Sequence, residues 1–367
     1  MKVKIRDVSN IIMGQSPDSS TYNTEKIGLP FFQGNADFGE LNPIAKTWCS
    51  APIKIAYKNY ILISVRAPIG ALNIAAETCC IGRGLAAFDV NNKMCTQKYL
   101  WYLLKAKKNE LLSKGTGSTF KAISKNILSE MEFNIPPVRE QELCTKVLDV
   151  VFCLIKLKKE QLDKLDLLVK SRFVEMFGEP NTNSKGYPLY TVDDVMKFQG
   201  GSQPDKKYFE YEPAEDNIRL IQIRDYRTDN YKTYIPKSMA KRFCNKDDIM
   251  IGRYGPPIFQ ILGGLEGSFN VALMKVIPKM GNTVFLRYFL KQECLLKYLE
   301  GMSQRTAGQD GIQMDKLKAY PFPYPPEDLQ NKFADFVAQV DKSKLAIQQS
   351  LDELETLKKS LMQQYFG

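Results

Sequence analysis

The side chains most often used for catalysis are missing from this sequence or occur without a catalytic pattern. Histidine is absent from the 367 residues, which removes histidine-based acid–base chemistry, histidine metal sites and the Ser-His-Asp triad. The eight cysteines include no Cys-x-x-Cys pair, and we expect buried free thiols in a reducing cytoplasm. These residue types favour binding over catalysis.

Three segments match known cofactor loops only in part. Phe32-Gln33-Gly34-Asn35-Ala36 lacks the second glycine of the F-x-G-x-G loop that binds S-adenosylmethionine in methyltransferases. Gly255-Pro256-Pro257-Ile258 lacks both ends of the D/N-P-P-Y/F tetrad used in amino methylation. Gly115-Thr116-Gly117-Ser118-Thr119-Phe120-Lys121 is too short for a nucleotide phosphate loop. We therefore expect no catalytic site, metal or cofactor in this chain.

The charge balance indicates the class of partner. Lysine and arginine outnumber acidic residues by 51 to 41, which gives a net charge of +10 and a pI near 9.0. This excess favours a polyanion, above all nucleic acid. The sequence starts Met-Lys-Val-Lys-Ile without a signal peptide, and no apolar run reaches the roughly 18 residues that span a membrane. We expect a soluble, cytoplasmic protein.

A long segment occurs twice, at 136–178 and at 325–367, with a constant separation of 189 positions. Apolar residues recur in both copies at three- and four-residue steps, which predicts helices. Each copy starts after Pro-Pro and ends at a glycine. A helix of about 40 residues would be about 60 Å long. Because the second helix follows the second half of the chain, antiparallel pairing is the simplest arrangement.

The rest of the chain also repeats in one order. Residues 1–17 match 188–204, 60–70 match 248–258, and 99–106 match 285–292. The duplication predicts a mixed α+β fold with two homologous globular domains, at 1–137 and 180–326. They are separated by a central helix at 138–179 and a C-terminal helix at 327–367. The polar loops differ between the copies, which fits two different reading surfaces or drift in unconstrained loops.

Three motifs and their duplication carry a family resemblance. They are Gly117-Ser118-Thr119-Phe120-Lys121-Ala122-Ile123-Ser124-Lys125, Ile135-Pro136-Pro137-Val138-Arg139-Glu140-Gln141, and Ser171-Arg172-Phe173-Val174-Glu175-Met176-Phe177-Gly178. The last motif returns as Ser360-Leu361-Met362-Gln363-Gln364-Tyr365-Phe366-Gly367. The whole chain resembles the specificity subunits of type I restriction-modification enzymes, with two target recognition domains and two conserved helices. In the second half, Gln304-Arg305-Thr306-Ala307-Gly308-Gln309 replaces the Gly-Ser-Thr-x-Lys motif.

The resemblance implies a non-catalytic DNA-binding subunit. Each domain would read one part of a split, asymmetric DNA target, and the two helices, an antiparallel coiled coil in a pseudo-twofold repeat, would set the unread gap. Two methyltransferase subunits would bind S-adenosylmethionine and methylate adenine N6. Restriction subunits that use ATP and Mg would attach through them.

The resemblance also implies roles for individual side chains. Guanine would pair with Arg66, Arg224, Arg253 and Arg305, and adenine with Gln33, Asn35, Gln222 and Gln309. Phosphates would bind Lys114, Lys121 and Lys125. Ser118, Tyr254 and Gln304 are further candidates for DNA contact. Each of these side chains could equally be an ordinary solvated residue, and Tyr254 could pack inside a loop.

The helices have candidate contact residues as well. We expect the seam between them to contain Leu143, Val147, Leu162, Leu165, Leu351 and Leu354. The outer faces would bind the methyltransferase subunits. The apolar residues Phe173, Met176, Met362 and Tyr365 could face that partner or pack on the adjoining domain.

Two other functions remain open from the sequence. One is a two-armed protein–protein adaptor without sequence-specific DNA reading. The other is an enzyme with an unrecognised active site, which the missing histidine and missing cofactor loops disfavour.

Overall fold

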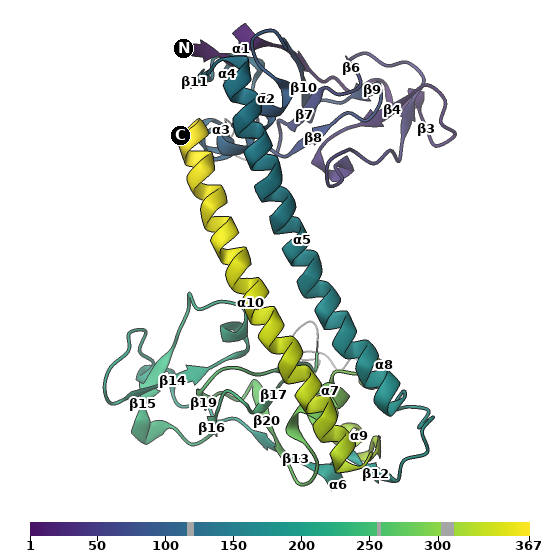
Figure 1. Ribbon diagram of the computed structural model, residues 1–367, viewed down its shortest axis with the longest axis vertical. Coiled ribbons are helices and arrows are strands. Elements are labelled where there is room, and N and C mark those ends of the chain that lie inside the picture. Colours follow the sequence, from purple (N-terminus) through teal and green to yellow (C-terminus); the bar gives the residue numbers. More distant parts are fainter. Residues whose placement is uncertain (116–120, 255–257, 302–311) are drawn as a thin grey trace. The chain divides into compact units, whose positions relative to one another are not determined.

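The computed structural model describes residues 1–115, 121–254, 258–301 and 312–367 (Figure 1). The chain divides into two compact units. Unit 1 is Met1–Lys159 with Gln349–Gly367, and unit 2 is Glu160–Gln348. The division falls inside two long helices, α5 (Val138–Phe177) and α10 (Glu327–Phe366), so each unit contains a part of both helices.

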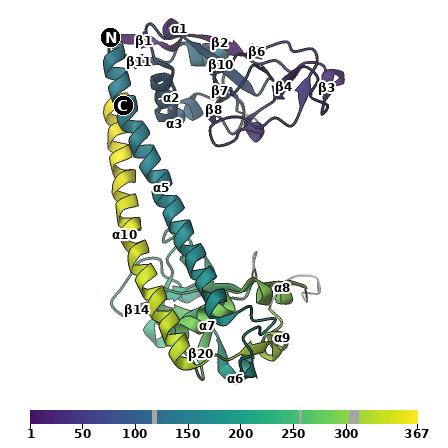
Figure 2. The same cartoon turned by 45° about the vertical axis from the view of Figure 1, so that its right-hand side comes forward.

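Unit 1 contains three sheets. One pairs β1 (Lys2–Lys4) with β11 (Glu132–Asn134), and an antiparallel sheet has the order β2 (Ser9–Met13), β10 (Leu85–Val90), β7 (Ile61–Ser64), β8 (Leu72–Ile74). The third has the order β3 (Tyr22–Asn23), β5 (Trp48–Cys49), β4 (Leu29–Phe32), β9 (Cys79–Ile81), β6 (Ile55–Ala56), with β4 and β9 parallel. Figure 2 shows the β3–β4 end of this sheet away from α5. The helical segments are α1 (Ile5–Val8), η1 (Ser19–Thr21), η2 (Asn35–Asp37), α2 (Gln97–Ala106), α3 (Lys108–Lys114) and α4 (Lys125–Ser129).

Unit 2 contains sheets with nearly the same order. One pairs β12 (Leu189–Thr191) with β21 (Pro321–Pro323), and an antiparallel sheet has the order β13 (Met196–Gly200), β20 (Leu273–Pro278), β17 (Ile249–Gly252), β18 (Gln260–Leu262). The third has the order β15 (Tyr234–Pro236), β14 (Asn217–Ile221), β19 (Gly267–Phe269), β16 (Phe243–Cys244), with β14 and β19 parallel. The helical segments are α6 (Val192–Val195), η3 (Lys206–Tyr208), η4 (Ile223–Tyr226), η5 (Lys237–Met239), α7 (Thr283–Leu290), α8 (Glu293–Gly301) and α9 (Met314–Ala319).

The predicted mixed α+β class is confirmed, since both units combine β-rich domains with the long helices. The four-stranded sheets correspond strand by strand, β2-β10-β7-β8 with β13-β20-β17-β18. The duplicated sequence therefore folds twice into one topology, which lets residues of the two units be compared through strand register.

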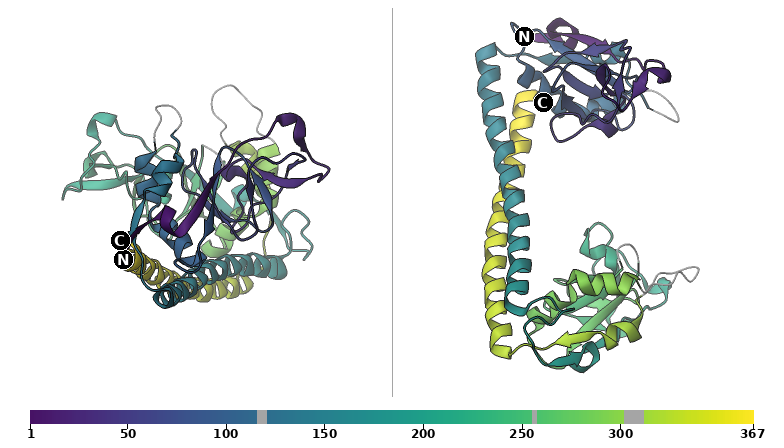
Figure 3. Two further views of the ribbon diagram at one scale, coloured as in Figure 1. Left: turned by 90° about the horizontal axis from the view of Figure 1, so that it is seen from above. Right: turned by 90° about the vertical axis from the view of Figure 1, so that its right-hand side faces the viewer.

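The long helices pack on each other antiparallel, as predicted (Figure 3). In unit 1, Lys159 near the middle of α5 forms an ion pair of 3.4 Å with Glu355 near the end of α10. In unit 2, Phe173 near the end of α5 packs against Phe333 near the start of α10, with ring centroids 5.5 Å apart. In unit 2 these rings also join α5 to the core, because Phe173 stacks on Phe285 of α7 with ring centroids 5.7 Å apart.

A buried glutamine anchors each long helix to its globular domain. Gln141 of α5 accepts a hydrogen bond from the Thr96 N–H at 2.8 Å and donates to the carbonyls of Met94 and Pro136, both at 2.9 Å. Thr96 is the N-cap residue of α2. The amide thus joins the first turn of α5 to the first turn of a domain helix.

The equivalent glutamine in unit 2 has the same role, and positions 141 and 330 differ by 189. Gln330 of α10 accepts from the Asn282 N–H at 2.8 Å and donates to the Pro325 carbonyl at 2.8 Å. Asn282 is the N-cap residue of α7. Both glutamine side chains are fully buried, so each needs these partners to satisfy its polar atoms.

The predicted seam is wrong for two residues. Leu143 is 57% exposed and Val147 is 44% exposed, whereas Cys144 and Leu148 are buried. Cys144 and Leu148 lie on the same face of α5 as Gln141, whose side-chain amide bonds to the domain. Among the other seam predictions, Leu351 is buried, and Leu162, Leu165 and Leu354 are half-buried. Two apolar stripes with the same spacing run along α5, and the anchoring glutamine decides which one is buried.

Four apolar helix residues were expected either to face a partner or to pack on the adjoining domain, and all four pack on their own unit. Phe173 is fully buried, and Met176 contacts the same core cluster in unit 2. Met362 and Tyr365 contact the core cluster of unit 1. They are therefore used for domain packing.

The eight cysteines are free, and Cys49, Cys79, Cys80, Cys95, Cys144 and Cys244 are buried. Cys294 is half-buried and Cys153 is exposed, so the prediction of buried thiols is wrong for Cys153. Among the described residues, no helix combines the length and apolar character that a membrane crossing requires.

Replacing Gln330 with leucine should destabilise the protein by about 2–4 kcal/mol, because the Asn282 N–H and the Pro325 carbonyl would be left buried without partners. Gln161→Leu, at an exposed position of α5, is the control and should change the free energy of unfolding little. Urea unfolding of the full chain measures both. Equal unfolding free energies for the two variants would contradict the anchoring role.

Two adjacent glycines give a sharper test of packing. A Cβ on Gly201 would stand 1.9 Å from the Asn270 carbonyl oxygen, whereas a Cβ on Gly200 would meet nothing within 4 Å. Gly201→Ala should therefore lower stability by about 1–3 kcal/mol or more, and Gly200→Ala should be close to wild type. Thermal unfolding of both variants checks this, and similar melting temperatures would refute the close approach.

Candidate nucleic-acid interface

The ends of four strands of unit 1 form one concave surface of about 490 Å³. Its lining includes Gln33 and Asn35 after β4, Arg66 after β7, Arg83 after β9 and Ser16 after β2. Three of these residues, Gln33, Asn35 and Arg66, were predicted to contact bases. The structure therefore brings together predicted residues that lie on separate loops of the chain.

Close backbone approaches hold these loops together. A Cβ on Gly84 would stand 2.2 Å from the Gln33 carbonyl oxygen, and a Cβ on Gly14 would stand 2.2 Å from the Gly82 carbonyl oxygen. Only glycine permits such contacts without a shift of the chain. The Asp37 carboxylate also accepts a hydrogen bond from the Gln33 N–H at 2.7 Å, which fixes the turn after β4.

The two arginines of this surface are available to a ligand. Arg66 and Arg83 are both exposed. Within the described residues, neither guanidinium forms an ion pair or donates a side-chain hydrogen bond. Arg66 forms an isolated β-bridge with Ala122, so the exposed Lys121 lies next to the same loop. The surface therefore combines free cationic donors with amide side chains.

In unit 2, Gln222 and Arg224 occupy the corresponding turn after β14. The Asp225 carboxylate accepts from the Gln222 N–H at 2.7 Å, as Asp37 does for Gln33. Both Gln222 Nε2 and Arg224 Nη2 donate to Thr233 Oγ1 at 3.1 Å. Unlike Arg66, Arg224 is thus partly engaged within its own unit.

The other two predicted residues of unit 2 also contact each other. Arg253 donates to the Val271 carbonyl at 3.4 Å, and its guanidinium lies 5.3 Å from the Tyr254 ring centroid. Both side chains are half-buried. Leu85 and Leu273 are the first residues of the equivalent strands β10 and β20. Leu85 pairs with Ser64 and Leu273 pairs with Gly252, so Ser64 and Gly252 are equivalent in strand register. Arg66 therefore corresponds to Tyr254, and Arg253 to the buried Val65.

Asp225 is the buried charged group of this site. Burial raises the pKa of its carboxyl above the ordinary 3.8, while the Gln222 N–H and the nearby Arg219 act in the opposite direction. Arg219 Nη2 lies 3.8 Å from Asp225 Oδ1 and 2.9 Å from Asp229 Oδ1. The turn after β14 therefore rests on a desolvated carboxylate.

The remaining predicted residues are more scattered. Lys114, at the end of α3, forms an ion pair of 2.6 Å with Glu110. Lys125, at the start of α4, lines a different concavity with Arg6 and Asp89. Ser118, Gln304, Arg305 and Gln309 lie outside the described residues.

Sequence reasoning missed Arg83 and Ser16. Arg83 stands between Gly82 and Gly84 at a strand end, and this glycine-flanked arginine is a signal that could have suggested an exposed loop side chain. Nothing in the sequence placed Ser16 beside it, because that neighbourhood depends on the pairing of β2 with β10.

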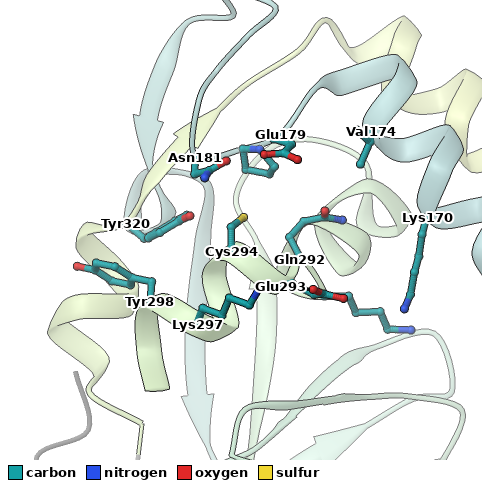
Figure 4. Close-up of a pocket in the computed structure, with 12 residues that line it drawn as sticks. Lys170, Val174, Glu179, Asn181, Gln292, Glu293, Cys294, Lys297, Tyr298 and Tyr320 are labelled. Carbon is teal, nitrogen blue, oxygen red and sulfur yellow. Dashed lines mark ion pairs between the residues drawn. The ribbon is translucent and has the colours of Figure 1, made fainter. Parts of the chain in front are cut away.

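A larger concavity, of about 720 Å³, lies elsewhere in unit 2 (Figure 4). Its lining includes Lys170 of α5, Cys294 and Lys297 of α8, and Tyr320. Tyr298 and Tyr320 pack there with ring centroids 5.0 Å apart. It shares no lining residue with the strand-end loops and is therefore separate from the candidate interface. Among the described residues, no group of three Cys, Asp or Glu side chains is arranged to hold a metal ion.

Comparison with known families assigns a class to this duplicated α+β domain with donor-bearing loops and two long helices. The family model described as "Type I restriction modification DNA specificity domain" matches residues 1–167 and 185–356. The chain belongs to this family, which confirms the resemblance seen in the sequence.

Individual relatives support the same assignment. One relative is a Methanocaldococcus jannaschii protein whose name gives it as the specificity subunit of the type I restriction enzyme MjaX. It is 40% identical to this chain over a match that covers 42% of this chain and 37% of the relative. The chain thus spans well under half of that relative. The crystal structure of a type I restriction-modification S subunit from M. genitalium matches with a TM-score of 0.60 at 17% identity, covering 100% of this chain and 96% of that chain.

The buried Asp225 predicts a pH dependence. Its folded pKa lies above the unfolded value, so the neutral form favours the fold, and stability is lost as pH rises through the folded pKa. Asp225→Asn stays neutral, so its free energy of unfolding relative to wild type should rise as pH increases above the ordinary carboxyl pKa of 3.8. Urea unfolding of both proteins at increasing pH measures the difference. A difference that shrinks as pH rises would mean that the attraction between Arg219 and the Asp225 carboxylate outweighs the cost of burying that carboxylate.

Proposed function

We propose that this chain is the DNA-reading specificity subunit of a type I restriction-modification enzyme. The observation that carries the proposal is that strand-end loops occupy equivalent positions in the two units. These loops present exposed donors in unit 1 and different side chains in unit 2. Because the loops differ, the two half-sites differ. The target is then bipartite and asymmetric.

In this proposal, affinity and discrimination come from different residues. Lysines such as Lys121, together with the net charge of +10, attract the phosphate backbone without reading sequence. Arginine and glutamine donors on the loops contact base edges in the major groove. Arg66 and Gln33 of unit 1 and Gln222 and Arg224 of unit 2 are the readers from the predicted set.

The chemistry is supplied by other subunits. Two methyltransferase subunits would bind S-adenosylmethionine and modify adenine N6, and restriction subunits with ATP and Mg would attach through them. A structure described as the basis of "complex assembly and conformational transition of the type I R-M system" matches the fold of this chain with a TM-score of 0.62 at 15% identity. Its description supports assembly into a larger complex.

An exposed stripe on α5 is the surface we propose for a methyltransferase subunit. It consists of Leu143, Val147, Val150, Leu154 and Leu157, each at least 40% exposed. Their three- and four-residue spacing matches the contact face of a helix that packs on another helix. Burying these aliphatic side chains against a partner helix is favourable by about 25 cal/mol per Å² of apolar surface removed from water, and an exposed apolar patch of this kind is typical of an interaction site.

Selection from a random duplex pool tests the function directly. The full chain should enrich one split motif, and its specific affinity should exceed its non-specific affinity by about 10³-fold or more. A protein–protein adaptor would show no such ratio at any salt concentration.

Lys121→Ala should weaken binding to all sequences alike and reduce the salt slope by about 0.9 for each phosphate that is no longer neutralised. Lys114→Ala should do less, because that ammonium is shared with Glu110. Lys297→Ala, an exposed lysine of α8, is the charge-matched control. Fluorescence anisotropy across a salt series measures the slopes, and identical slopes for all three variants would contradict the phosphate role of Lys121.

Val150→Glu should weaken binding of the methyltransferase subunit by about tenfold or more, because it places a charge at the centre of the apolar stripe. DNA binding by the isolated chain should be unchanged. Leu345→Glu, at a position of α10 that is 62% exposed, is the control. Co-purification and calorimetry measure assembly, and normal assembly of the Val150 variant would exclude this face.

A further inference from the structure

Strand register assigns equivalent positions to the loops of the two units. In the parallel pair of unit 1, Phe32 lies opposite Ile81, and in that of unit 2, Ile221 lies opposite Phe269. The hydrogen bond from the Gly82 N–H to the Phe32 carbonyl, 2.8 Å, recurs as the bond from the Asn270 N–H to the Ile221 carbonyl, 3.1 Å.

The following residue is therefore equivalent as well. Arg83 follows Gly82, and Val271 follows Asn270. The next hydrogen bond agrees, since the Val65 N–H donates to the Gly84 carbonyl and the Arg253 N–H donates to the Ala272 carbonyl, both at 2.9 Å. Arg83 and Val271 thus occupy the same place at the tip of the same strand connection.

These two residues have opposite chemistry. Arg83 is exposed, and its guanidinium has no ion pair or side-chain hydrogen bond within the described residues. Val271 is 44% exposed, although Phe269 and Leu273, the strand residues on either side of this connection, are fully buried. An aliphatic side chain that stays exposed at a loop tip does not stabilise the fold.

A second pair of equivalent loop positions shows the same difference in charge between the two units. Arg66 shares the concave surface with Arg83 in unit 1, and its equivalent in unit 2 is Tyr254. Arginines of unit 2 near this frame are engaged within the unit, since Arg253 donates to the Val271 carbonyl and Arg224 to Thr233. At the two equivalent positions, unit 1 therefore presents two free guanidinium groups and unit 2 presents none.

We infer that the position occupied by Arg83 and Val271 determines which base each half-site contains. Arg83 donates to N7 and O6 of a guanine in the half-site of unit 1. Val271 contacts the C5-methyl group of a thymine in the half-site of unit 2. Both choices follow from major-groove chemistry, where arginine pairs with guanine and apolar side chains pack on the thymine methyl. The inference rests on the proposed DNA-reading function.

The test exchanges the two side chains in the full-length chain. Wild type, Arg83→Val and Val271→Arg are each used to select sequences from a random duplex pool. In Arg83→Val, the preference for guanine at one position of one half-site should fall roughly tenfold or more. In Val271→Arg, one thymine of the other half-site should be replaced by guanine.

Two controls separate base reading from folding and from general affinity. Both positions are exposed, so thermal unfolding of the variants should match wild type. Lys121→Val should lower affinity without altering the selected motif. An Arg83→Val variant that binds all sequences more weakly with its motif unchanged would overturn the inference, as would a Val271→Arg variant with an unchanged second half-site. A wild type that selects no motif would instead overturn the proposed function itself.

Discussion

The buried amides of Gln141 and Gln330 are the interaction on which the rest of this structure depends. Each joins the first turn of a long helix to the N-cap residue of a domain helix, Thr96 or Asn282. A buried amide has a fixed set of donors and acceptors, so it specifies rotation as well as position. Apolar packing alone would tolerate a rotated helix, because both faces of α5 carry aliphatic stripes.

That rotational choice has a functional consequence. With Gln141 facing the domain, Cys144 and Leu148 are buried and the stripe from Leu143 to Leu157 stays in solvent. The repeat does not preserve this stripe: Lys332, Phe336 and Gln339 of α10 stand 189 positions after Leu143, Val147 and Val150. A chain with two copies of one scaffold can therefore present different surfaces on its two helices, just as its strand-end loops differ between the two units.

The division between scaffold and loops explains how one topology can serve two half-sites. Glycines at close backbone approaches and carboxylates that cap the turns, Asp37 and Asp225, hold equivalent loops in equivalent positions. The side chains at the tips are then free to differ, because they contribute little to the core. Specificity can change at Arg83 or Val271 without a cost in folding.

The sequence alone determined the duplication, the α+β class, the two long helices and the family, because each follows from spacing and order along the chain. It also named Gln33, Asn35 and Arg66, which share one surface. Tertiary structure decided what spacing could not: which α5 stripe is buried, that Arg253 and Arg224 are engaged within unit 2 while Arg66 is free among the described residues, and that Arg83 belongs to the interface. Those facts depend on strand register and helix rotation, and both are set by contacts between residues far apart in the chain.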